Sequence, residues 1–128
     1  MNEERYQRGK QVRESILGHA HAARTAKNRT AFNADFQDFL MEYAWGGIWA
    51  RPGLDHKTRS MITIAALTAL GREAELKAHI RGGLNVGLSR EQIVEIILQL
   101  AFYAGQPAAH AGFRAAKEVF DQIDAAGR

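Results

Sequence analysis

The chain has 128 residues, a net charge of +3 and no cysteine. This length suits one ordinary domain, residues 1–128, that buries a core without cross-links. The lack of cysteine excludes disulfides, thiolate metal sites and thiol catalysis. The longest near-apolar run, Met61 to Leu70, is too short to span a bilayer, so we expect no membrane partner and a cytoplasmic location.

The positive charge is concentrated in residues 1–30, which hold seven Lys and Arg against three Asp and Glu. These charges are spread out, acidic residues lie between them, and few aromatic side chains are present to stack on bases. The pattern therefore predicts no nucleic-acid partner. A solvated helix face, or an arm docked on a neighbouring subunit, is the expected alternative.

Helical spacing of apolar residues recurs along the chain without strand alternation, so the predicted fold class is all-α, with about six helices. The first helix is expected from Glu3 to Leu17, followed by a basic connector over residues 18–29. A second helix is expected to begin near Thr30, whose hydroxyl can cap it, and to end by Gly46 and Gly47. It carries an apolar stripe formed by Phe32, Phe36, Phe39, Leu40 and Tyr43.

A third helix is expected to start at the N-cap Asp55 and to end at Leu70. From Met61 onward it is apolar nearly all round, which predicts burial on several sides and hence contacts between subunits. A fourth helix is expected over Glu73–Asn85, closed by a glycine at position 87.

The capping box of Ser89 and Gln92 predicts the start of a fifth helix. Gly105 is expected to stop it, and Pro107 suits the first residue of a sixth helix that runs to about Ala125. No linker or low-complexity segment interrupts this series.

Glu75 and His79 lie four residues apart on the fourth helix, so both side chains leave the same face. A carboxylate beside an imidazole raises its basicity and orients it, as a general acid or base requires. An ordinary surface pair at this spacing is the alternative.

Three arginines and two tryptophans form a second group of candidates. The arginines can clamp carboxylates and the tryptophans can form an apolar wall. Alternatively, the tryptophans belong to the core and the arginines form salt bridges, such as one from Asp55 to Arg59. The members of this group are Arg51, Arg59, Arg81, Trp45 and Trp49.

No metal or cofactor is expected. His19, His21, His56 and His110 form no zinc motif. Gly82, Gly83 and Gly87 follow no predicted strand and so are no dinucleotide fingerprint.

Several short segments carry a family resemblance over nearly the whole chain. The most specific are IWARPGLD at 48–55 and ELKAHIR at 75–81. The others are RY at 5–6, GHAH at 18–21, ADFQ at 34–37, YAWG at 43–46, RSMITIAAL at 59–67, GLSREQIVE at 87–95 and YAGQPAA at 103–109. With these segments the chain resembles the carboxymuconolactone decarboxylase family, which shares its helical fold with AhpD-type alkylhydroperoxidases.

The peroxidase branch of that fold uses a CxxC motif ahead of the histidine that matches His79. Glu75 stands here in place of the second cysteine, so the resemblance favours a carboxy-lyase and not a thiol peroxidase. The sequence departs from the typical decarboxylase pattern at Gly47, Val86, Gln106 and His110.

The resemblance implies decarboxylation of an unsaturated γ-lactone dicarboxylate to 3-oxoadipate enol-lactone in aromatic catabolism. The substrate supplies its own electron sink, so no cofactor is needed. Arg51 then anchors a carboxylate with Arg59 or Arg81, and His79 delivers a proton while Glu75 orients it. Trp45, Trp49 and Ile48 provide apolar walls.

The resemblance also implies a homo-oligomer, trimeric or hexameric. Two alternatives stay open at this point. One is a family member acting on another lactone or a β-keto-type acid, and the other is a non-catalytic helical oligomer that binds an acidic metabolite.

Overall fold

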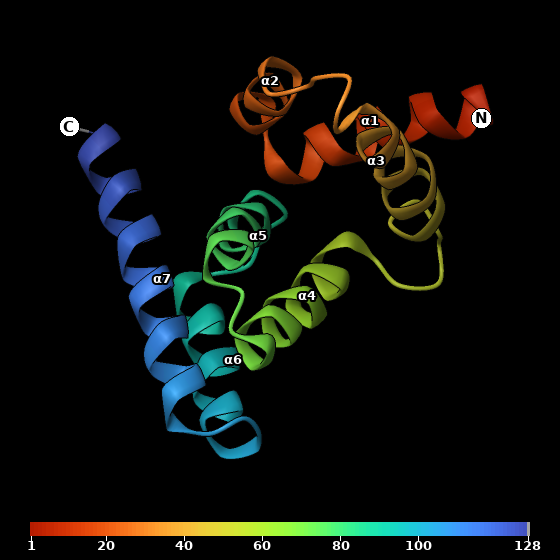
Figure 1. Ribbon diagram of the computed structural model, residues 1–128. Coiled ribbons are helices and arrows are strands. Elements are labelled where there is room, and N and C mark those ends of the chain that lie inside the picture. The colour runs from red at the N-terminus through yellow and green to blue at the C-terminus, as the bar shows by residue number, and fades with distance from the viewer. Residues whose placement is uncertain (128) are drawn as a thin grey trace. The chain divides into compact units, whose positions relative to one another are not determined.

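A computed structural model describes residues 1–127, and every element in them is helical (Figure 1). The all-α prediction is therefore confirmed. In chain order the helices are α1 (Glu3–Leu17), α2 (His19–Lys27), α3 (Ala34–Phe39), the π-helix η1 (Leu40–Ile48), α4 (His56–Leu70), α5 (Glu73–Asn85), α6 (Arg90–Tyr103) and α7 (Gln106–Ala126).

The chain divides into two compact units, unit 1 over Met1–His56 and unit 2 from Lys57 on. No helix within residues 1–127 has both the length and the apolar composition needed to cross a membrane.

Unit 1 is built on close contact between α1 and η1. A Cβ on Gly9 would overlap the carbonyl oxygen of Met41, and a Cβ on Gly46 would overlap the carbonyl oxygen of Arg5. Only glycine lets the two backbones approach this closely. Arg8 Nε donates across the same contact to the Gly46 carbonyl oxygen over 3.4 Å.

The expected basic connector over residues 18–29 is wrong, because its central part forms α2. Four alanines within His19–Lys27 explain the helix, since alanine has the highest helix propensity. Gly18, at φ 94°, is the single residue that separates α1 from α2. The positive charge of this segment therefore lies on a helix.

The second expected helix begins later than predicted and changes character. Asn33 precedes α3, and its Oδ1 accepts from the Thr30 amide over 2.8 Å in a turn, so Thr30 is not the cap. The helix widens into η1 at Leu40. The side chains of the predicted apolar stripe are largely exposed, with Phe32 at 99 % and Phe36 at 62 % of their full accessible surface.

Unit 2 packs α5, α6 and α7 around one apolar core, and Figure 1 shows α7 running alongside α6. The helices expected at residues 56–70 and 73–85 are confirmed, as is the capping box of Ser89 and Gln92. Pro107 is the second residue of α7. The buried core residues are Ile64, Leu76, Ile80, Leu88, Ile93, Ile97, Ala109, Ala115, Ala116 and Val119.

A polar ladder joins α5 to α7. The two Arg114 donors reach the Glu73 carboxylate at 2.6 and 3.1 Å. One turn further along, Lys77 Nζ lies 2.5 Å from Glu118 Oε2. Another turn along, Arg81 Nη2 donates to Gln122 Oε1 over 2.5 Å. The sequence separation is the same at each rung, so the two helices run in the same direction and in fixed register.

Candidate functional site

The two tryptophans of unit 1 form a buried aromatic pair. The ring centroids of Trp45 and Trp49 lie 4.9 Å apart with planes tilted by 31°, and each side chain is below 10 % exposed. The His56 ring follows at 6.3 Å from Trp49, and its Nε2 lies 3.1 Å from the Trp49 carbonyl oxygen. A carbonyl only accepts, so Nε2 carries a proton. The pair therefore belongs to the packed part of unit 1.

Arg51 lies in the exposed loop that follows η1. It borders an open hollow of about 360 Å³ together with Pro52, Leu54, Asp55 and His56. The Arg51 amide donates to the Ile48 carbonyl over 3.1 Å, which tightens the turn after the π-helix. Ile48 itself is half exposed. The loop therefore presents a guanidinium close in sequence to the tryptophan pair.

Glu75 and His79 lie on α5 in unit 2. Leu76 and Ile80 are buried, which fixes how α5 is rotated about its axis. With that rotation Glu75 is exposed and His79 is half buried, with its Nδ1 atom shielded from solvent. Arg81 contacts α7 through the ladder. As its separation of two residues predicts, Arg81 and His79 leave different sides of the helix.

Arg59 lies on α4, also in unit 2. Its side chain is half buried and its Nε atom is shielded from solvent. Its backbone carbonyl accepts from Thr63 Oγ1 over 2.8 Å, inside the helix. Thus each unit supplies part of the predicted set, and a shared cavity for the guanidinium and imidazole groups stays a prediction.

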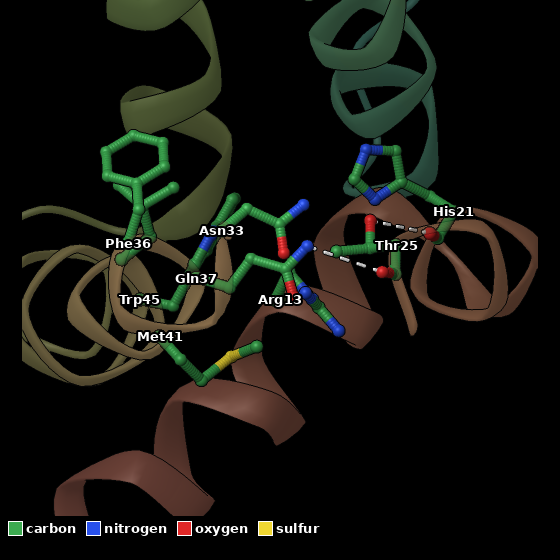
Figure 2. Close-up of a pocket in the computed structure, with 9 residues that line it drawn as sticks. Arg13, His21, Thr25, Asn33, Phe36, Gln37, Met41 and Trp45 are labelled. Atoms are coloured by element: carbon green, nitrogen blue, oxygen red, sulfur yellow. Dashed lines mark hydrogen bonds between the residues drawn. The ribbon is translucent and has the colours of Figure 1, made fainter. Parts of the chain in front are cut away.

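Sequence reasoning missed a cavity of about 340 Å³ inside unit 1 (Figure 2). Its lining comes from α1, α2, α3, η1 and the turn before α3, which is why no local motif revealed it. From the sequence, Arg13 counts among the dispersed charges of residues 1–30, and His21 among the histidines that form no zinc motif. The lining residues are Arg13, His21, Thr25, Asn33, Phe36, Gln37, Leu40, Met41 and Trp45.

Ionisation is shifted at two of these groups. Burial lowers the pKa of Arg13, although Tyr6 and Glu14 partly oppose it. Burial also lowers the pKa of His21, and the positive charges of Arg13 and Arg24 add to the effect. Over residues 1–127, no three acidic or histidine side chains gather where they could hold a metal ion.

Comparison with known proteins defines the class. Residues 34–118 match the carboxymuconolactone decarboxylase family, and the chain belongs to that family. It is 46 % identical over 122 residues to a 4-carboxymuconolactone decarboxylase from Acinetobacter baylyi, covering 95 % of this chain and 91 % of that protein. It is also 34 % identical over 120 residues to a nitrosuccinic acid decarboxylase from Metarhizium robertsii, covering 93 % and 84 % of the two chains.

Proposed function

We propose that this protein is a carboxy-lyase that decarboxylates 4-carboxymuconolactone to 3-oxoadipate enol-lactone in aromatic catabolism. The observation that carries the proposal is the 46 % identity to the Acinetobacter decarboxylase, which extends over 95 % of the chain. The position of the imidazole supports it, because α5 holds His79 half buried with Glu75 one turn away on the same face.

The reaction needs no external electron acceptor. The bond between the ring and its carboxylate breaks, CO₂ leaves, and the electron pair passes through the ring alkene to the lactone carbonyl. A proton then adds to a ring carbon of the resulting dienolate. The protein must therefore anchor two carboxylates, stabilise the negative charge on the lactone oxygen and deliver one proton.

We assign these tasks to the residues expected from the sequence. His79 delivers the proton and Glu75 orients the imidazole. Arg51 anchors a carboxylate, and Arg59 or Arg81 provides the second clamp. Arg81 Nη2 donates to Gln122 Oε1 on α7, whereas the Arg59 side chain lies half buried on α4.

Apolar walls complete the proposed site. Trp45 and Trp49 are packed against each other, so they offer a rigid surface that excludes water. Ile48 precedes Trp49 at the end of η1. A less aqueous environment favours loss of CO₂, because charge spreads from a carboxylate into a larger system.

We also propose that the protein forms a homo-oligomer, trimeric or hexameric. Large apolar side chains of unit 2 lie exposed, with Leu70 at 69 % and Phe102 at 84 % of their full accessible surface. A second copy of the chain would remove these surfaces from water. A cytoplasmic location stays a prediction.

A second candidate substrate follows from the Metarhizium relative. Nitrosuccinic acid is also a dicarboxylic acid, and its nitro group can accept the electron pair left by CO₂. The 34 % identity to a decarboxylase of that acid favours testing a dicarboxylate with an electron sink other than a lactone.

The test uses purified protein with a chelator present. We expect loss of the ultraviolet absorbance of 4-carboxymuconolactone together with release of one CO₂ per lactone. Faster turnover of nitrosuccinate would favour the second candidate. Tight binding of the lactone without CO₂ release would contradict the enzyme assignment and favour a binding protein.

A further inference from the structure

The cavity of unit 1 has the form of a ligand site. Its volume of about 340 Å³ lies in the range of small-molecule pockets. Its lining comes from α1, α2, α3 and η1, and Figure 2 shows Phe36 and His21 on opposite sides with Arg13 and Gln37 between them. All of these elements belong to the same compact unit, so the cavity is defined by local packing.

Two residues of the lining each carry a nitrogen atom without a partner. Arg13 Nε and His21 Nδ1 are shielded from solvent, and neither makes a hydrogen bond. Folded proteins retain few buried polar atoms of this kind, and each one calls for an explanation. A ligand in the cavity that makes these two side chains shift slightly and hydrogen bonds to both atoms would provide one.

The charge around these atoms favours an anion. The lining contains an arginine and a histidine but no Asp or Glu. Glu14, next to Arg13 in sequence, is hydrogen bonded to His19 Nδ1 at 2.6 Å. An anionic group in the cavity would therefore meet positive charge that no lining carboxylate neutralises.

The remaining lining favours an apolar ligand body. Phe36, Leu40, Met41 and Trp45 supply apolar surface. Two polar side chains nearby are already used, since Gln37 Nε2 donates to the Thr25 carbonyl over 3.4 Å and Thr25 Oγ1 donates to the His21 carbonyl over 3.0 Å. The polar end of a ligand thus belongs at Arg13 and His21.

We propose that this cavity binds a small carboxylate, with its carboxyl group at Arg13 and His21 and its apolar body against Trp45 and Phe36. The two basic residues precede residue 34, so they lie outside the segment that matches the family. The carboxylate has two possible sources: the substrate of the proposed decarboxylation, or a second acid that binds without reacting.

The direct test measures ligand binding to the purified protein by NMR at the Arg13 Nε–H group and the His21 ring. The probe is muconolactone, which has one carboxylate and cannot undergo the proposed reaction. Its neutral methyl ester is the control ligand. We expect saturable shifts of both signals with muconolactone and none with the ester. No saturable shift, or equal binding of the ester, would overturn the proposal.

Variants make the test specific. Arg13→Gln and His21→Gln should each weaken muconolactone binding at least about tenfold. Arg24→Gln removes an exposed charge from α2 outside the lining and should leave affinity within about twofold. Circular dichroism checks that each variant folds. An equal loss in all three variants would overturn the proposal, because it would reflect net charge alone.

Kinetics distinguish the two sources of carboxylate. If the cavity binds the decarboxylation substrate, Arg13→Gln raises KM for 4-carboxymuconolactone and leaves kcat nearly unchanged. If it binds a separate acid, both constants stay as in the parent protein while NMR still reports binding. The interpretation of the cavity as a substrate site rests on the proposed function, but the NMR measurement of binding does not. If muconolactone binds but the protein does not decarboxylate 4-carboxymuconolactone, the proposed function is rejected and the proposed binding site is retained.

Discussion

The backbone of α1 at Gly9 lies so close to the Met41 carbonyl oxygen of η1 that no Cβ fits between them. Gly9→Ala must therefore separate the two helices. We expect a loss of about 3 kcal/mol in the free energy of unfolding, the upper end for overpacking, because a backbone atom cannot rotate away as a side chain can. Urea denaturation measures it.

The matched control for this change is Gly53→Ala. A Cβ there meets nothing within 4 Å, and the residue has no positive φ. Its unfolding free energy should stay within about 0.5 kcal/mol of the parent value. Equal effects of the two substitutions would contradict the close contact.

The rung from Glu73 to Arg114 predicts a pH effect. Hydrogen bonding and charge from Arg114 lower the pKa of Glu73 below its ordinary 4.5. A lowered pKa means that this contribution to stability is present above pH 4.5 and is lost as the pH falls through the folded-state pKa.

NMR titration of the Glu73 carboxyl carbon should give a midpoint below 4.5, and Arg114→Gln should move that midpoint upward. Asp38, whose pKa is lowered by Arg29 in unit 1, serves as the internal control and should not move. An unchanged Glu73 midpoint in the variant would show that the rung is absent in solution.

His79→Ala should lower kcat for 4-carboxymuconolactone by at least about 100-fold, as expected for loss of a general acid. Glu75→Gln should give a smaller loss and shift the pH profile, because that residue positions the imidazole. Stopped-flow absorbance measures kcat for each variant across the pH range. Near-parent kcat in His79→Ala, with folding retained, would remove the imidazole from the mechanism.

Arg51→Lys keeps the charge but removes the planar pair of donors that binds a carboxylate at two points. We expect KM to rise about tenfold or more. Lys57→Arg, an exposed charge-preserving change just after the loop, is the control. Unchanged kinetics in Arg51→Lys would point to a structural arginine.

Ile62→Asp tests self-association. Ile62 is 53 % exposed on α4, so a charge there should cost an isolated chain little. If α4 packs against another copy, burying the carboxylate disrupts the oligomer. Light scattering after size exclusion should report a smaller assembly for the variant, whereas an unchanged mass would exclude this part of α4 from the interface.

Local signals explain which parts of the fold could be predicted. The limits of α5 and the capping box at Ser89 depend on residues next to them in sequence, and both were predicted correctly. The segment that forms α2 was wrongly predicted as a connector, because its basic residues suggested a loop although its alanines favour a helix. The π-helix was missed because its wider turn has no simple periodic signature.

Some features of the candidate site could likewise be predicted from neighbouring residues in the sequence, and others could not. The four-residue spacing of Glu75 and His79 is visible in the sequence, and so is the loop position of Arg51. The contact from Arg81 to Gln122 was not, because it joins residues 41 apart. The cavity beside Arg13 and His21 likewise depends on packing among four helices.

The order of charges at Glu73, Lys77, Arg114 and Glu118 favours the observed alignment of α5 and α7. Sliding α7 by one turn in one direction would bring Glu118 opposite Glu73, and sliding it in the other would bring Arg114 opposite Lys77. Either displacement brings two side chains of like charge next to each other, which is unfavourable. The contacts between α5 and α7 therefore hold α5, which carries the imidazole of His79, at a defined position relative to α7.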